Sequence, residues 1–406
     1  MKHMSCKSVG ARNQAGFTLI EMMITMALTL IIMGSTLGAM NNAIRAGEVA
    51  TLTTNMNQGL RTAMDIMVRD MLQVGQGLPS GRTVDIPNGT GSAEIWVPAG
   101  PNVLNSAPRT MPQVWTATTV GTTTTYAWKA AEEITAIIPG PGAGPTINGV
   151  PTDEITMVLA DGAFLSTISD YDVNLTALDA TRMVVDPLVD ISNGGADDLH
   201  VGDLIMLQKT TSTTLVQITR APLSTDTGTA AQTVYFDTPD SLNLNQTVGA
   251  NGTLTKHIAI APVDSVADAT TGFVPSTATR IRLISYYLDA TDPARPRLVR
   301  RINNGHPTAY NNTLGTAVAF DIENLQITYD LVDGVTNPSG IKMNAADRST
   351  GGACGTKACS ANQIRKINVT ITGRSRTRMT QTRQFFRNTL TTQVSLRSMS
   401  FMDRYR

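Results

Sequence analysis

The chain has 406 residues, with 32 basic and 32 acidic side chains and therefore a formal net charge of zero. That balance excludes a general electrostatic nucleic-acid binder, because such proteins carry a basic excess that neutralises phosphates. A hydrophobic fraction of 41% suffices for a buried core, and the length fits one large domain or two ordinary ones.

Residues 1–16 form a basic leader, with Lys2, Lys7 and Arg12 and no acidic residue. An ordinary secretory signal has its small-residue cleavage site after the apolar region. Here the best-placed small residue, Gly16, comes before that region. A cut after Gly16 would remove the leader, including Cys6, and keep the apolar segment.

A long apolar run follows, with an acidic residue at its head. Met22 to Ile44 are 23 uncharged residues between Glu21 and Arg45, enough to span a bilayer as a helix. A carboxylate deep in hydrocarbon costs about 2.5 kcal/mol or more, so Glu21 needs a compensating partner. Gly34 and Gly38 lie four residues apart in the run. This small-residue pair has three interpretations: it allows another helix to approach closely, it makes the helix more flexible, or it arises by chance because glycine is common in membrane helices.

The hexapeptide Gly16-Phe17-Thr18-Leu19-Ile20-Glu21, between a basic leader and an apolar run, resembles the prepilin signal of type IV pilins and type II secretion pseudopilins. The resemblance implies that a prepilin peptidase cuts between Gly16 and Phe17 and methylates the new Phe17 amine. Glu21 of an incoming subunit would then pair with the cationic Phe17 amine of a neighbour in the filament. The alternative is an uncleaved signal anchor with a stray Glu21.

Apolar residues at spacings of three and four extend the helix beyond the membrane. They are Leu52, Met56, Leu60, Met64, Met67 and Met71, while Arg61, Asp65, Arg69 and Asp70 lie largely off this stripe. Gly75, Gly77 and Pro79 supply stop signals. We therefore expect one helix over residues 17–77, membrane-spanning in 17–44, whose second part packs on a sheet. A partner surface is the alternative for a Met-rich stripe.

Residues 78–406 alternate short β-type runs with turn residues. The sequence therefore predicts an α+β fold, in which the long N-terminal helix packs on a mostly antiparallel β-rich domain with a large central insertion and a basic C-terminal part. Predicted strands are 94–97, 134–138, 154–159, 203–208, 215–219, 234–237, 257–261, 280–288, 297–302, 318–331 and 364–372. Residues 121–125 and the Pro/Gly run from Pro139 are predicted loops.

Four later segments resemble, in this order, the PilW-type minor pilins: 280–289 (RIRLISYYLD), 297–301 (RLVRR), 324–334 (NLQITYDLVDG) and 364–375 (IRKINVTITGRS). Residues 59–75, 201–219 and 391–398 also fit. This resemblance implies a minor pilin in the inner membrane, with a periplasmic domain, that primes pilus assembly and sits at or near the pilus tip. A J-type minor pseudopilin of a type II secretion system is the close alternative. The chain's length and its Gly202-Asp203 region favour the pilus protein.

Cys354 and Cys359 remain once the leader is removed. An even pair in an exported chain favours a disulfide, with free thiols or half a metal site as alternatives. Asp197, Asp198 and Asp203, or Asp289 and Asp292, offer oxygens to calcium, but neither set has an EF-hand spacing, and turn-forming Asp is the default. We therefore expect no metal.

Enzyme chemistry has little support. His200, His257 and His306 lie far apart, and the sequence contains no GxSxG, HExxH or P-loop motif. We expect no catalytic residue and no cofactor.

Charge is unevenly distributed. Residues 130–200 hold twelve acids and one base, and residues 364–406 hold ten bases and one acid. Such fields steer subunit docking within a Debye length of about 8–10 Å, or simply belong to solvated strand faces. Expected partners are the prepilin peptidase, other minor pilins and the major pilin, the inner membrane and a possible surface ligand. DNA contact by the basic, aromatic-containing tail is a lesser alternative.

Overall fold

The computed structural model describes residues 16, 18–78, 84–85, 115–120, 123–128, 133–161, 172–178, 182–185, 191, 199–209, 212–223, 225–237, 240, 244–245, 277–303, 315–380 and 382–401. The chain divides into two compact units. The helix unit comprises Met1–Thr54 with Thr377–Phe386, and the head comprises Asn55–Arg376 with Arg387–Arg406. Predicted strands 94–97 and 257–261 lie outside the described residues.

A single helix, α1 (Leu19–Leu72), contributes to both units. The hydroxyls of Thr25, Thr29 and Thr36 donate to carbonyls three or four residues back, so polar side chains in the apolar part are satisfied within the helix. The helix ends at Leu72, five residues before the predicted Gly77, because residues 73–77 form turns. Gly75 and Gly77 have φ values of 75° and 73° there, which glycine adopts readily.

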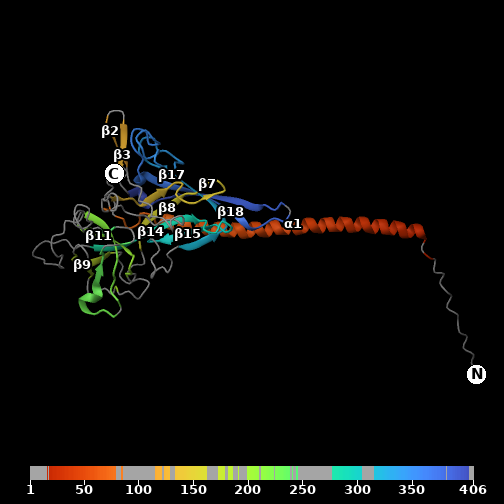
Figure 1. Ribbon diagram of the computed structural model, residues 1–406, viewed down its shortest axis with the longest axis horizontal. Coiled ribbons are helices and arrows are strands. Elements are labelled where there is room, and N and C mark those ends of the chain that lie inside the picture. The colour runs from red at the N-terminus through yellow and green to blue at the C-terminus, as the bar shows by residue number, and fades with distance from the viewer. Residues whose placement is uncertain are drawn as a thin grey trace, which may run out of the picture. The chain divides into compact units, whose positions relative to one another are not determined.

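The larger sheet of the head is built around the long strand β14 (Thr277–Asp289). The first part of β14 pairs with β9 (Asp172–Leu178) and β11 (Leu204–Lys209). Its second part pairs with β8 (Glu154–Ala160) and β15 (Arg297–Ile302), and Figure 1 shows these strands side by side. All four pairings are antiparallel. This sheet has 12 strands among the described residues.

A second, antiparallel sheet contains β17 (Ile322–Leu331), β18 (Ile364–Arg378) and β19 (Phe385–Ser395), in that order. Burial alternates along β17 and β18, so one face of these strands is covered and the other is solvated. Thr370 and Thr372 of β18 pair their hydroxyls with Thr391 and Thr389 of β19 on the more exposed face.

The remaining described elements are short. They are β1 (Val84–Asp85), β2 (Trp115–Val120), β3 (Thr123–Trp128), β4 (Glu133–Ile134), β5 (Ile137–Gly140), β6 (Thr146–Ile147), β7 (Val150–Pro151), β10 (Arg182–Val185), β12 (Ser212–Gln217), β13 (Thr233–Tyr235), β16 (Thr316–Phe320) and the 3₁₀ turns η3 (Gly228–Gln232), η5 (Ala361–Gln363) and η6 (Ser398–Phe401). The one parallel pairing among the described strands joins β1 to β12.

The structure confirms the mostly antiparallel sheet and the α+β class, and it corrects two predicted loops. β3 takes up residues 123–125, because β-branched threonines suit a strand that pairs with β2. Pro139 and Gly140 belong to β5, at the edge of the sheet beside β8. The predicted strand 318–331 is split at Asp321, whose φ of 61° ends β16 before β17 begins.

The second half of α1 buries the predicted stripe within the head. Met56, Leu60, Met64, Met67 and Met71 are all at most 8% exposed, whereas Leu52 is only half-buried. Leu60 packs against Gly373 of β18, where an added Cβ would lie 3.1 Å from Leu60 Cδ2. After the helix, the Gly75 amide donates to the Val158 carbonyl of β8 at 2.9 Å. The helix end is therefore fixed to both sheets.

Asp70 was expected to lie off the apolar stripe, but its side chain is buried where the helix meets the larger sheet. Its carboxylate accepts from the Tyr286 hydroxyl at 2.6 Å and from Arg300 Nε at 2.5 Å. Tyr286 lies on β14 and Arg300 on β15. Burial, with Asp70 beside it, raises the pKa of Tyr286, and Asp70 raises the pKa of Arg300 despite the opposing effect of burial. One carboxylate thus joins the helix to two strands.

Replacing Asp70 by Ala should lower the free energy of unfolding of the head by about 2–3 kcal/mol, because the buried Tyr286 hydroxyl and the Arg300 guanidinium both lose their acceptor. Asp65→Ala is the matched control, since Asp65 is exposed on the same helix, and should change stability by less than about 0.5 kcal/mol. Urea unfolding of the full chain in detergent, followed by near-ultraviolet circular dichroism, measures both. Equal losses in the two variants would contradict this account.

Candidate functional site

Thr18 and Glu21 form a reciprocal cap at the start of α1. The Thr18 amide and hydroxyl both donate to Glu21 Oε2 at 3.0 Å, and the Glu21 amide donates to Thr18 Oγ1 at 3.3 Å. This arrangement is a capping box, in which two otherwise unpaired amides of the first turn are satisfied. The Thr-x-x-Glu spacing was readable in the sequence, although the role expected for Glu21 was intermolecular. Gly16 is exposed just before the cap, and Phe17 lies outside the described residues.

The cap leaves Glu21 with acceptor capacity. Both donors from Thr18 bond to Oε2, and no described donor bonds to Oε1. A carboxylate accepts from several donors at once. Glu21 can therefore cap its own helix and still accept a cationic amine from another molecule.

The first half of α1 exposes its apolar side chains all round. Leu30 and Ile31 are 69% and 68% exposed, and the large apolar residues from Leu19 to Ile44 are similarly uncovered. Within the described chain, α1 is the one helix long and apolar enough to cross a membrane. Gly34 and Gly38 have no atom within 4 Å of an added Cβ, and α1 continues through both. Their surface is therefore open among the described residues.

The opposite charges noted in the sequence are partly neutralised inside the head. Asp153 pairs with Lys342 at 2.6 Å, and Asp161 pairs with Arg280 and Arg282 at 2.7 and 2.6 Å. Arg374, one of the ten bases in residues 364–406, pairs with Glu323 at 3.0 Å and donates to the Ala294 carbonyl. Ion pairs within the described residues therefore neutralise some of the charges in both regions.

Glu323 binds two arginines of the basic C-terminal part. Arg387 Nε lies 2.6 Å from Glu323 Oε2, and Arg374 Nη1 lies 3.0 Å from Glu323 Oε1. Burial would raise the pKa of Glu323, but hydrogen bonds from Arg387 and its other partners outweigh burial and lower it. Residues 402–406, including Tyr405 and part of the basic tail, lie outside the described residues.

The candidate calcium oxygens have other partners. Asp289 accepts from Thr291 and Arg297, and Asp292 accepts from the Ala294 amide. Asp203 is fully buried 3.7 Å from Arg280, and burial raises its pKa despite that arginine. The described residues contain no group of three or more His, Cys, Asp or Glu arranged to hold a metal. Asp197, Asp198, His257 and His306 lie outside the described residues.

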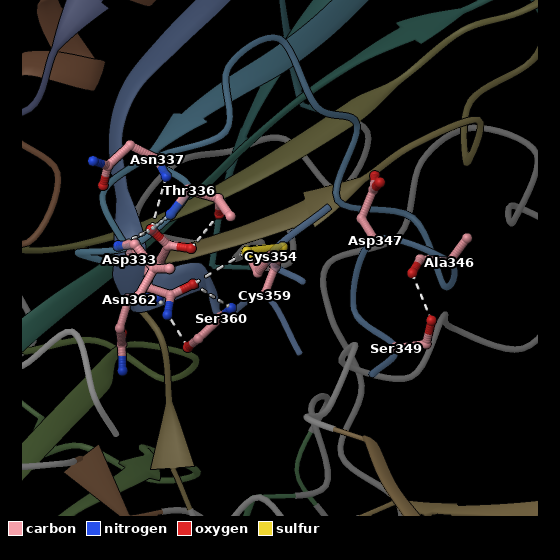
Figure 2. The surroundings of a disulfide bond; sticks show 12 residues. Asp333, Thr336, Asn337, Ala346, Asp347, Ser349, Cys354, Cys359, Ser360 and Asn362 are labelled. Atoms are coloured by element: carbon pink, nitrogen blue, oxygen red, sulfur yellow. Dashed lines mark hydrogen bonds between the residues drawn. A yellow bond between two sulfur atoms is a disulfide. The ribbon is translucent and has the colours of Figure 1, made fainter. Parts of the chain in front are cut away.

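Cys354 and Cys359 form a disulfide in the segment between β17 and β18, and both are buried. Figure 2 shows the bond beside Ser360, which caps the 3₁₀ turn η5 by accepting from the Asn362 amide. At the start of the same segment, Asp333 accepts from the amides of Val335, Thr336 and Asn337 and from the Thr336 hydroxyl. The segment is thus held at both ends.

Asp333 makes this segment sensitive to acid. Burial opposes its ionisation, but the bonds from Thr336 and the three backbone amides outweigh burial and lower the pKa of Asp333 to about 2. An unfolded Asp has a pKa of about 3.9. The ionised folded form is therefore favoured, and its contribution to stability is complete above the unfolded pKa and lost as pH falls through about 2.

The difference in unfolding free energy between wild type and Asp333→Asn should therefore be constant above about pH 5 and shrink as pH falls toward 2. Urea unfolding of both proteins across this range gives the difference directly. Asp65→Asn, on the exposed face of α1, serves as the control. A gap for Asp333→Asn that widens in acid would contradict the assignment.

Comparison with known families identifies one match, the prokaryotic N-terminal methylation motif, over residues 11–37. The match contains Gly16, Phe17 and Glu21 and the beginning of α1. No curated protein and no solved structure matches the chain. Such a motif implies processing by a prepilin peptidase and assembly with other pilins, which suggests a structural rather than an enzymatic protein. The chain therefore carries a type IV prepilin-like N-terminus, followed by an apolar helix and an antiparallel β-rich head.

Proposed function

We propose that this protein is a minor pilin that helps to prime type IV pilus assembly and then sits at or near the pilus tip. The observation that carries the proposal is the composition of α1. Its first half is exposed, apolar and headed by Glu21 within the methylation motif, while one face of its second half is buried in the head. The exposed apolar half of such a helix needs a covering, and the described residues of the chain do not supply one.

The bilayer is the first covering. From Leu19 to Ile44 the helix is about 39 Å long at 1.5 Å per residue, longer than a hydrocarbon core of about 30 Å. Residues 17–44 would span the inner membrane after the leader, residues 1–16, is removed. Residues 78–406 would lie in the periplasm, where an oxidising environment suits the Cys354–Cys359 disulfide.

Neighbouring helices are the second covering, in the filament. Cleavage after Gly16 would give Phe17 a cationic amine, and Glu21 Oε1 would accept it from an adjacent subunit while Oε2 keeps the Thr18 cap. Pairing neutralises a charge that is costly in an apolar filament core. It also sets the axial register, because the two groups lie one helical turn apart. Gly34 and Gly38 would let the helices approach closely.

The minor-pilin assignment draws on the PilW-type resemblance of segments that form β14, β15, β17 and β18. A J-type minor pseudopilin of a type II secretion system remains the second candidate, because pilins and pseudopilins share the N-terminal signal. Deleting the gene separates the two. Loss of pili with normal protein secretion supports the minor pilin, and the reverse supports the pseudopilin.

Glu21→Gln tests the proposed assembly contact. The glutamine amide oxygen can still accept from the Thr18 amide, so capping survives while the negative charge is lost. We expect normal membrane insertion and cleavage, and at least about a tenfold loss of the protein from sheared filaments, the equivalent of about 1.4 kcal/mol. Immunoblots of membrane and sheared fractions give both quantities.

Thr18→Ala is the matched variant, because it removes the capping hydroxyl and keeps the carboxylate. It should cost about 1 kcal/mol of local helix stability and leave most incorporation intact. If Thr18→Ala impaired incorporation while Glu21→Gln assembled normally, Glu21 would be a helix cap and not a docking group.

A further inference from the structure

The tip of the β18–β19 hairpin, Thr377–Phe386, belongs to the helix unit and is bonded to α1. The Thr380 amide and hydroxyl donate to Glu48 Oε1 at 3.2 and 2.8 Å. Inside the tip, the Met379 amide donates to the Gln384 carbonyl at 2.9 Å, and the Arg383 amide donates to the Met379 carbonyl at 3.0 Å. The tip is therefore a closed turn held at one level of the helix.

That level is close to the end of the apolar run. Glu48 comes four residues after Ile44, the last residue of the uncharged run, which is about 6 Å along a helix axis. The polar headgroup layers add about 10–15 Å in total to a hydrocarbon core of about 30 Å. With residues 17–44 in the bilayer, Thr380 would lie in or next to one headgroup layer.

The tip carries two arginines that have no ion-pair partner among the described residues. Arg378 and Arg383 are exposed, and neither forms an ion pair with a carboxylate in the described chain. Arg374 and Arg387, which flank the tip on the same two strands, instead share Glu323. The hairpin therefore neutralises its flanking arginines within the head and presents two unpaired ones at its end.

The apolar groups of the tip suit an interface between water and lipid. The Arg378 guanidinium lies 5.1 Å from the centroid of the Phe385 ring. Phe385, Phe386 and Met379 are half-buried. Arginine with aromatic and aliphatic neighbours is the composition found where proteins meet lipid headgroups. Arg45, on the helix itself, adds a third cation one turn before Glu48.

We propose that this hairpin tip binds the phosphate groups of anionic lipids through Arg378 and Arg383, and so fixes the height of the subunit in the membrane before assembly. The proposal rests on the membrane-inserted state of the proposed function. Each arginine near an anionic surface contributes about fivefold in binding. The competing occupant is an acidic surface of a neighbouring subunit, which would not respond to lipid charge.

The test is hydrogen exchange of the full chain in two kinds of nanodisc, one of phosphatidylcholine alone and one of an equal mixture with phosphatidylglycerol. Peptides covering residues 377–386 should exchange at least about fivefold more slowly in the anionic discs. Arg378→Gln combined with Arg383→Gln should abolish that difference. Arg295→Gln combined with Arg397→Gln, which removes two exposed arginines of the head, should preserve it.

Protection of residues 22–44 serves as the internal reference. If these residues are protected in both discs and the tip exchanges equally in both, the lipid contact is wrong and membrane insertion stands. If residues 22–44 are unprotected in both discs, the proposed function itself fails. Tip protection that grows with protein concentration and ignores lipid charge would assign the arginines to a neighbouring subunit and overturn the proposal.

Discussion

The structure depends on one constraint, which is that a single uninterrupted helix must serve two different surroundings. Up to Ile44, the described part of the chain does not cover α1, and from Met56 the apolar stripe of α1 is buried in the head. The Asp70 contact with Tyr286 and Arg300 fixes the second part. Because α1 is continuous over this length, one element links the exposed apolar part to the head.

Glu21 has two roles, as a cap of its own helix and as the proposed contact with a neighbouring subunit. A carboxylate at the head of a membrane helix looked like an unpaired charge, but its Oε2 atom is already committed to Thr18. In the proposed membrane-inserted state, this bond would lower the cost of keeping the acid in hydrocarbon, because the charge is already hydrogen-bonded. The second oxygen stays open to a stronger, cationic donor. Capping and docking are therefore compatible uses of one side chain.

The periodicity of apolar residues correctly predicted the helix, its buried face and most strands of the two sheets, because these depend on neighbouring residues. It did not predict contacts between residues that are far apart in the sequence. Asp70 meets Tyr286 and Arg300 more than 200 residues away in the sequence, and no local pattern marks it as buried. Strands β9, β10 and β19 were missed because their composition is mixed, and their pairing with neighbours supplies the order. The Thr-x-x-Glu spacing is typical of the Thr18 cap, but the spacing does not show which other donors Glu21 accepts.

The arginines of the C-terminal part likewise have roles that composition alone did not predict. The excess of bases after residue 364 suggested one broad docking field, yet Arg374 and Arg387 are bound to Glu323 within the head. Arg378 and Arg383 are exposed, on a turn bonded to Glu48. An exposed charge acts over roughly one Debye length, about 8–10 Å. These two arginines therefore act on whatever lies beside that turn of α1, and for an inserted helix the nearest anionic surface is the lipid headgroup layer.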